Sequence, residues 1–113
     1  ALIMSTRIEE KYYPDGKLET RLYYNEKNEL HREDGPAEER FYTSGKICSR
    51  RWYFEGKLHR EKGPAVEILH FIKRPVSIYY YLNGKHLSIS EHRRQVMLQK
   101  LTAEIATDCE VRL

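Results

Sequence analysis

The chain has 113 residues, of which 33% are charged and 40% are hydrophobic, and its formal net charge is +3. This length allows one domain or one short array of repeats, and no apolar run approaches the roughly 20 residues that a membrane-spanning helix needs. Nine tyrosines and a modest aliphatic share predict a thin core made largely of aromatic rings. The mild positive charge permits an acidic partner without demanding one.

The start of the chain and its cysteines favour an intracellular protein. Residues 1–7 are expected to form a flexible terminus, in which Met4 is the natural start and the three residues before it are a cloning remnant. The opening letters are too few for a signal peptide. Cys48 and Cys109 lack the closer spacing of a disulfide framework, which favours reduced thiols and a cytoplasmic location.

Residues 8–87 carry an internal repeat. The phrase HREDGPA at 31–37 recurs as HREKGPA at 59–65, a shift of 28 residues. The same shift aligns Tyr24 with Trp52 and Tyr80, and it aligns Asn28 with Gly56 and Gly84. A second repeated turn, which contains Gly16 and Gly45, loses its glycine at 73–75. We therefore expect two full repeats and a third that lacks its GPA end. The residues expected to hold the repeats together are Gly16, Gly35, Pro36, Gly45, Trp52, Gly56, Gly63, Pro64, Tyr80 and Gly84.

Each repeat has the pattern of strands joined by tight turns. Residues 17–24 and 76–82 alternate with the period of two expected of a half-buried strand. Residues 46–54 alternate less regularly, because Arg50 falls on the face of Trp52. Asp-Gly and Asn-Gly pairs between the strands favour tight hairpins, since both residues can take positive φ. The expected fold is mainly β (α+β), a repetitive antiparallel β-hairpin meander of about two and a half 28-residue repeats.

The repeated phrase predicts that the chain makes the same bend at 31–37 and at 59–65, and we call each bend a corner. Its Gly is expected to supply an unusual φ, its Pro to fix φ and withhold an N–H, and its Ala to fit where backbones approach. Arg32 and Arg60 should pair with carboxylates of neighbouring repeats. The histidines of the phrase should decorate the turn, with their stems packed on neighbouring aromatic rings.

Residues 88–113 change to a helical composition and form the expected C-terminal helix and tail. Ser88 fits the start of a capping box, and Ser90 is a competing cap. A helix over about 90–106 should pack on the last hairpin and cap the open end of the array. The apolar residues that share one face of this helix are Leu98, Leu101 and Ile105.

The residues offer no constellation for catalysis or metal binding. Metal ligands must converge on one ion, whereas a whole repeat separates His31 from His59. Glu33 and Asp34 are adjacent in an extended chain and point to opposite faces, so they form no carboxylate pair. A serine elbow, a phosphate loop and a nucleotide fingerprint are absent from the sequence. We therefore expect no enzyme, no catalytic residue, no cofactor and no metal.

One longer pattern runs over residues 12–87. Its residues are Gly45-Lys46, Trp52-Tyr53, Gly56-Lys57, His59-Arg60, Gly63-Pro64-Ala65 and residues 80–85. This pattern resembles a family of degenerate MORN-type repeats found in bacteriophage and giant-virus proteins and in related bacterial genes. The resemblance implies arrays of β-hairpins used for binding. The chain departs from it at FIKRPVS, where the Gly-Lys turn is replaced by an expected basic corner of Lys73 and Arg74.

We expect a non-catalytic binding module whose partner is a protein. Tyr, Trp and Arg are the residue types enriched in interface hot spots. The viral resemblance implies a small accessory protein that docks on a host or viral protein and inhibits or redirects it. A homodimer is also compatible with the pattern. The candidate contact residues are Arg50, Arg51, Lys73, Arg74, Tyr79, Tyr81, Arg93 and Arg94.

Two other functions stay open. Arginines beside rings, as at residues 49–54, could stack bases and neutralise phosphates on an exposed sheet face. Tyrosines repeated in one column are also what a stacked aromatic core requires. A structural module would instead self-associate through its sheet edges. A membrane role is not expected, because the C-terminal helix is the only candidate and its moderate charge fits a packed cap better.

Overall fold

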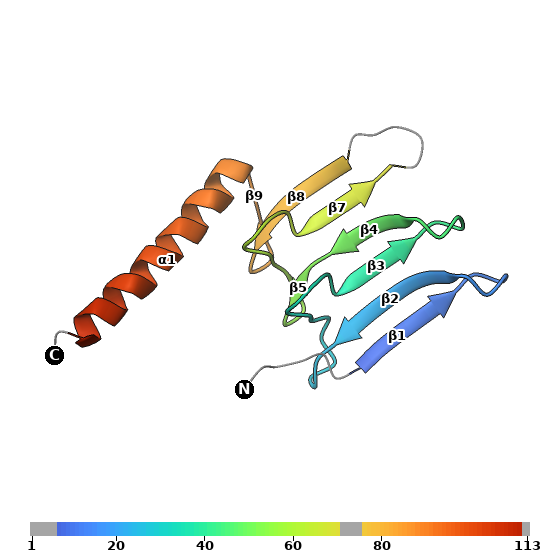
Figure 1. Cartoon of the computed structure of the whole chain (residues 1–113), viewed down its shortest axis with the longest axis horizontal. Coiled ribbons are helices and arrows are strands. Elements are labelled where there is room, and N and C mark those ends of the chain that lie inside the picture. Colours follow the sequence, from blue (N-terminus) through green and yellow to red (C-terminus); the bar gives the residue numbers. More distant parts are fainter. Residues whose placement is uncertain (1–6, 71–75, 112–113) are drawn as a thin grey trace.

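The computed structural model describes residues 7–70 and 76–111, with side chains up to residue 106. Its centre is a seven-stranded antiparallel sheet in the order β1-β2-β3-β4-β7-β8-β9, beside a small hairpin, β5-β6, and a helix, α1 (Figure 1). The bounds are β1 (Arg7–Tyr12), β2 (Leu18–Tyr24), β3 (Glu38–Phe41), β4 (Ile47–Arg51), β5 (Tyr53–Phe54), β6 (Lys57–Leu58), β7 (Val66–Leu69), β8 (Val76–Leu82), β9 (Lys85–Leu87) and α1 (Ile89–Val111). The expected β-hairpin meander with a C-terminal helix is confirmed.

The sheet is one layer thick, and its strands lie side by side in a twisted ribbon (Figure 1). The molecule measures 63 × 34 × 18 Å, and its Cα radius of gyration is 17.2 Å. A compact chain of this length would have a radius of gyration of about 13 Å. Because a single layer encloses little space, most strand residues are half-buried or exposed.

The core runs along one end of the strands, where the corners and the small hairpins pack. Leu22 of β2, Val66 of β7 and Leu82 of β8 are buried there. Ala37 and Ala65, the last residues of the two copied phrases, have no exposed surface. The expected aromatic core is wrong, because none of the nine tyrosines is buried. Small and aliphatic side chains fill the closed positions of the thin sheet, and the tyrosine rings around them are half-buried or exposed.

The hairpin turns are of two kinds. In the turns at 55–56 and 83–84, both central residues have positive φ, as expected of two-residue hairpins. In the turns at Gly16 and Gly45 only the glycine has positive φ, and the register of the flanking strands shifts by one residue. This second geometry is that of a longer turn closed by a glycine bulge.

The loop between Tyr24 and Leu30 contains one more residue than the corresponding loop of the next repeat, between Tyr53 and Leu58. Five residues separate Tyr24 from its bridge partner Leu30, whereas four separate Tyr53 from Leu58. Asn28, with a φ of 62°, closes the longer loop in the left-handed conformation. The expected role of Asn28 as a turn residue is confirmed, but the loop lengths differ.

This extra residue corrects the alignment of the repeats. The N–H of Tyr23 donates to the carbonyl of Ala37, as the N–H of Trp52 donates to that of Ala65. Tyr23, rather than Tyr24, is therefore the counterpart of Trp52, and the shift upstream of the loop is 29 residues. A one-residue shift moves a strand's side chains to the other face of the sheet. Arg50 consequently corresponds to Arg21 and lies in the same charged row. This explains why an arginine stands on the face of Trp52 in the alternating pattern of residues 46–54.

Alternating charges cross one face of the sheet in register, and we call this side the ladder face. The row consists of Glu10, Arg21, Glu39, Arg50 and Glu67, and it ends at Ile78 of β8. The side-chain nitrogen and oxygen are 3.1 Å apart in the Arg21–Glu10 pair and 3.3 Å apart in the Arg50–Glu67 pair. The opposite face carries Leu22, Glu38, Arg51, Val66 and Tyr79 in the neighbouring row.

Each corner is tied to the next repeat by its histidine. Nδ1 of His31 accepts a hydrogen bond from the N–H of Glu55, and Nδ1 of His59 accepts one from the N–H of Asn83, both at 2.9 Å. The ring of Phe54 lies between them, with centroid distances of 4.6 and 5.9 Å. The expectation of a surface histidine is wrong for His31, which is fully buried because the Phe54 hairpin closes over it.

The arginine of each phrase folds back onto its own corner. Nη1 of Arg32 donates to the carbonyl of Pro36 at 3.2 Å, and Nη1 of Arg60 donates to that of Pro64 at 3.1 Å. Neither glycine of the two phrases has positive φ, so the expected backbone role is wrong. A Cβ added at Gly35 would lie 2.9 Å from Cζ of Arg32. The glycine is needed because the guanidinium occupies the place of its side chain.

Helix α1 docks on the array through its first two turns. The hydroxyl of Ser88 accepts the N–H of Glu91 at 3.2 Å, which confirms Ser88 as the cap. His92 is 3% exposed, and its Nε2 lies 2.6 Å from the carbonyl oxygen of Arg60. Its ring lies 5.1 Å from that of Tyr80. These contacts fix the helix to the second corner and to the last hairpin.

Beyond these turns the helix projects away from the sheet (Figure 1). The expected packing of its apolar face is wrong, because Leu98, Leu101 and Ile105 are 46–62% exposed. At 100° per residue, these side chains lie opposite to His92 and Val96, which take the docked side. The described part of the chain contains no helix long and apolar enough to cross a membrane.

Candidate binding groove between the two corners

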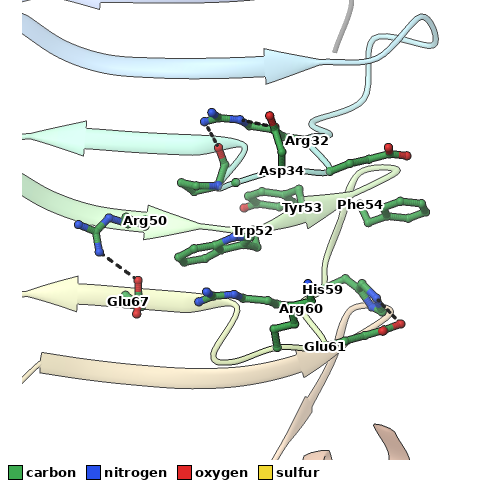
Figure 2. A pocket seen from close by; sticks show the side chains of 14 residues that line it. Arg32, Asp34, Arg50, Trp52, Tyr53, Phe54, His59, Arg60, Glu61 and Glu67 are labelled. Carbon is green, nitrogen blue, oxygen red and sulfur yellow. Dashed lines mark hydrogen bonds and ion pairs between the residues drawn. The ribbon is translucent and has the colours of Figure 1, made fainter. Parts of the chain in front are cut away.

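An open groove of about 800 Å³ lies between the two copied corners, beside the ladder face (Figure 2). Residues 32–36 of the first corner form one wall, and residues 59–62 of the second corner form the other. Strand β4 contributes Arg50, β7 contributes Glu67, and residues 52–54 lie between the walls. We call this site the intercorner groove. The repeat creates it, because two corners that differ at one residue of the seven-residue phrase stand one hairpin apart.

The arginine of the first corner is fully engaged. Nε of Arg32 lies 3.1 Å from Oδ1 of Asp34, and Nη1 lies 3.6 Å from Oε1 of Glu39. Its Cζ stands 4.0 Å from the centroid of the Tyr23 ring. Two carboxylates, one carbonyl and one aromatic face therefore surround this guanidinium.

The arginine of the second corner has a different environment. Cζ of Arg60 stands 3.7 Å from the centroid of the Trp52 ring. Lys62 holds the position that corresponds to Asp34. Glu67, which corresponds to Glu39, pairs instead with Arg50. Within the described ranges, no carboxylate oxygen lies within 4.0 Å of the Arg60 guanidinium.

Burial lowers the pKa of the Arg60 guanidinium from its ordinary value. The Glu67 carboxylate acts in the opposite direction, and the neighbouring charge of Arg50 lowers the pKa further. The guanidinium remains charged at neutral pH, since arginine side chains do not lose their proton there. Arg60 is therefore a partly desolvated cation whose charge the described residues compensate poorly.

Aromatic rings lie between the two walls. The rings of Trp52, Tyr53 and Phe54 can be followed in Figure 2. Trp52 and Tyr53 are half-buried, and Phe54 is 37% exposed. Burial raises the pKa of the Tyr53 phenol above its ordinary value, and the carboxylate of Glu38 acts in the same direction. Tyr53 is therefore a neutral hydrogen-bonding group at physiological pH. These rings offer large, rigid apolar surfaces to a ligand.

The two walls differ in charge. The first wall presents the carboxylates of Glu33 and Asp34, and the side chain of Asp34 is 82% exposed. The second wall presents Arg60 and the exposed Lys62, while its Glu61 lies 3.9 Å from Nε2 of His59. The groove therefore has an acidic rim and a basic rim that face each other.

The lining of the groove consists mainly of charged and aromatic side chains. Its residues include no serine, threonine or cysteine that could act as a nucleophile beside a base. In residues 7–70 and 76–106, no group of three or more His, Cys, Asp or Glu side chains is placed to hold a metal ion. Guanidinium groups, carboxylates and ring faces are suited to charged and aromatic groups of a partner.

The contact residues expected from the sequence are dispersed over the molecule. Arg50 lines the intercorner groove, but Arg51 lies on the opposite face, with Nη1 3.0 Å from Oε2 of Glu38. Tyr79 and Tyr81 also lie on that opposite face of β8. Strand alternation separates these neighbours, so one surface cannot present them all.

Of the remaining candidates, two lie on helix α1 and two lie outside the described residues. Arg93 and Arg94 are exposed on the first turns of α1. Lys73 and Arg74, with the third turn of the repeat pattern, lie outside the described residues. The expected basic corner at 73–75 therefore remains a prediction.

The residues that sequence reasoning missed are those of the corners themselves. Asp34 and Lys62 are the one difference within two otherwise identical seven-residue phrases. That difference could have drawn attention to the site, because it removes a carboxylate beside one of two equivalent arginines. The comparisons add no relative: no family model, no curated protein and no solved structure matches this chain.

Proposed function

We propose that this chain is a non-catalytic binding module that docks on a protein partner through the intercorner groove. The observation that carries the proposal is the lining of the groove, which combines three rings, three guanidinium groups and an exposed lysine in one open site. Arginine, tryptophan and tyrosine are the residues that most often anchor protein interfaces. The groove is also open to solvent, so a segment of a partner can enter it.

Hydrogen bonds to the neighbouring turns hold both walls of the groove, which supports a binding role. His31 and His59 tie the two corners to the turns of the following repeats. A site fixed before binding loses less conformational entropy when the partner arrives. The repeated hydrogen bonds therefore prepare the groove as well as the fold.

The charges of the groove favour a protein over a nucleic acid. Glu33, Asp34, Glu61 and Glu67 all line it, and they would repel a continuous chain of phosphates. A protein segment can instead place groups of both signs against both rims. The finer form of the proposal, in which the partner is a host protein that is inhibited or redirected, is supported by the resemblance to viral repeats alone.

Site-specific photo-crosslinking tests the proposal. A photoreactive phenylalanine analogue replaces Phe54, which lies in the groove, and in a control it replaces Tyr12, which is 56% exposed on β1. In extract from the native cell, we expect one dominant protein to be crosslinked from position 54 and not from position 12. The same crosslinks from both positions, or nucleic acid crosslinked from position 54, would contradict the proposal.

A further inference from the structure

The two corners differ in how they neutralise the same arginine. In the first corner, Asp34 and Glu39 both lie within 4.0 Å of the Arg32 guanidinium. In the second corner, Lys62 replaces the aspartate, and the equivalent glutamate pairs with Arg50. The corners are otherwise alike in their hydrogen bonds from arginine to proline and from histidine to the next turn. The second corner therefore keeps the geometry of the first but lacks its anion.

The missing anion leaves a defined place for a ligand group. Nε of Arg32 donates to Oδ1 of Asp34 at 3.1 Å, whereas among the described residues the corresponding Nε of Arg60 has no hydrogen-bond acceptor. Lys62 adds a second positive charge at the rim, while the charge of Arg50 is balanced by its partner Glu67. Burial lowers the pKa of the Arg60 guanidinium because it removes water from the charged group. An anion that binds there would compensate this charge through a charge-assisted hydrogen bond.

We infer that the intercorner groove recognises an acidic side chain of an extended protein segment, and that Arg60 and Lys62 bind this carboxylate. The inference rests on the proposed function, because it assigns the chemistry of the partner at the same groove. The carboxylate takes the place that Asp34 holds beside Arg32 in the first corner. A basic group of the same segment faces Glu33 and Asp34 on the opposite rim.

The substitution Lys62→Asp is the decisive variant. It gives Arg60 the internal carboxylate that Arg32 already has. The first corner, which folds with this pair, shows that the second corner can fold with it too. The introduced carboxylate competes with that of the ligand, and it removes a cation from the rim. A direct change of Arg60 is less informative, because Arg60 also supports the corner through Pro64 and Trp52. Lys46→Asp is the matched control, with the same charge change at the other end of the strands.

The experiment selects phage-displayed random peptides of about ten residues, roughly 33 Å long when extended, on the full chain. Amide NMR shifts then locate the bound peptides. We expect shifts at Arg50, Trp52 and Arg60, and one acidic position common to the selected peptides. The Lys62→Asp variant should bind them roughly 10- to 100-fold more weakly, as the loss of a charge-assisted hydrogen bond implies, and Lys46→Asp should bind them unchanged. Replacing the common acid by its amide should weaken binding to the original chain and not to the variant.

The outcomes separate the two proposals. Peptides that bind at the groove without a common acid, and equally well to the Lys62→Asp variant, would overturn the inference and leave the proposed function standing. Peptides that bind elsewhere, or no selected peptide at all, would overturn the proposed function and the inference with it. A single-stranded oligothymidylate that shifts the same amides and binds more weakly to Lys62→Asp would replace the acidic peptide by a nucleic acid.

Discussion

His31 joins two repeats through a single buried ring. Its Nδ1 accepts the N–H of Glu55, and its side chain has no exposed surface. The substitution His31→Ala leaves this N–H without its acceptor and opens a cavity beneath Phe54. We expect a loss of about 2–4 kcal/mol in the free energy of unfolding. Urea titration followed by the fluorescence of Trp52, the one tryptophan of the chain, measures it.

The exposed His86 supplies the control for this change. It lies on β9, and its ring contacts Tyr81 and Tyr79 at centroid distances of 5.1 and 5.9 Å. His86→Ala should change the free energy of unfolding by less than about 0.5 kcal/mol. Equal effects of the two substitutions would show that the buried histidine does not join the repeats.

Gly35 makes room for a guanidinium, and a double-mutant cycle can show this. Gly35→Ala places a Cβ at 2.9 Å from Cζ of Arg32 and displaces the end of that side chain. We expect a loss of about 0.5–1.5 kcal/mol, which should vanish when Arg32 is already alanine. Gly45→Ala is the control, because nothing lies within 4 Å of its Cβ and its cost comes from a φ of +89°. Its effect should be the same with and without Arg32.

The sequence predicted these residues but not their roles. The repeat of seven letters was enough to place a corner at 31–37 and at 59–65. It could not show that the arginine folds over the glycine, because φ and the direction of a side chain depend on contacts with Tyr23 or Trp52. The sequence pattern therefore indicates backbone freedom at the corner glycine, whereas the cause in the structure is steric.

At the scale of elements, helix α1 is stabilised at one end. Its first two turns contact the array through His92, whereas residues 97–106 are exposed. Removal of residues 97–113 should therefore change the stability of the array by less than about 0.5 kcal/mol. His92→Ala should cost about 1–3 kcal/mol, because it leaves the carbonyl of Arg60 without a donor. Urea unfolding of the two variants checks both; a truncation as costly as His92→Ala would contradict the projecting helix.

The positions of the elements were harder to predict than their existence. Strand alternation and the Ser88 cap predicted the hairpins and the start of the helix. A single extra residue in the loop closed by Asn28 was invisible to an alignment made at a constant shift of 28. Since side chains alternate along a strand, that one residue moved Arg21 into the row of Arg50. The packing of the helix could not be predicted either, because the apolar face of a helix is not always the face that meets the sheet.

At the scale of the whole molecule, the stability of the array should come from contacts between neighbouring repeats. The pairs β2-β3 and β4-β7 join successive hairpins, and the histidine bonds join successive corners. Among residues 7–70 and 76–111, distant repeats do not meet in a common interior, because the sheet is one layer thick (Figure 1). Each added repeat in such an array brings its own interface, so length and stability should rise together.

A duplication of residues 38–65, inserted after Ala65, tests this architecture. The inserted copy begins where β3 begins and ends with the buried Ala of the corner, so the charge row continues with Arg50 opposite the new Glu39. We expect the sheet to lengthen by about 10 Å, the width of two strands, and the melting temperature to rise by about 5 °C or more. Small-angle scattering and a thermal melt measure the two effects. An insertion that lacks Ser49 is the control, because a one-residue deletion in β4 turns the following side chains to the wrong face and should lower the melting temperature. If both insertions are equally stable, register does not hold the array together, and the groove between its corners would lose its fixed walls.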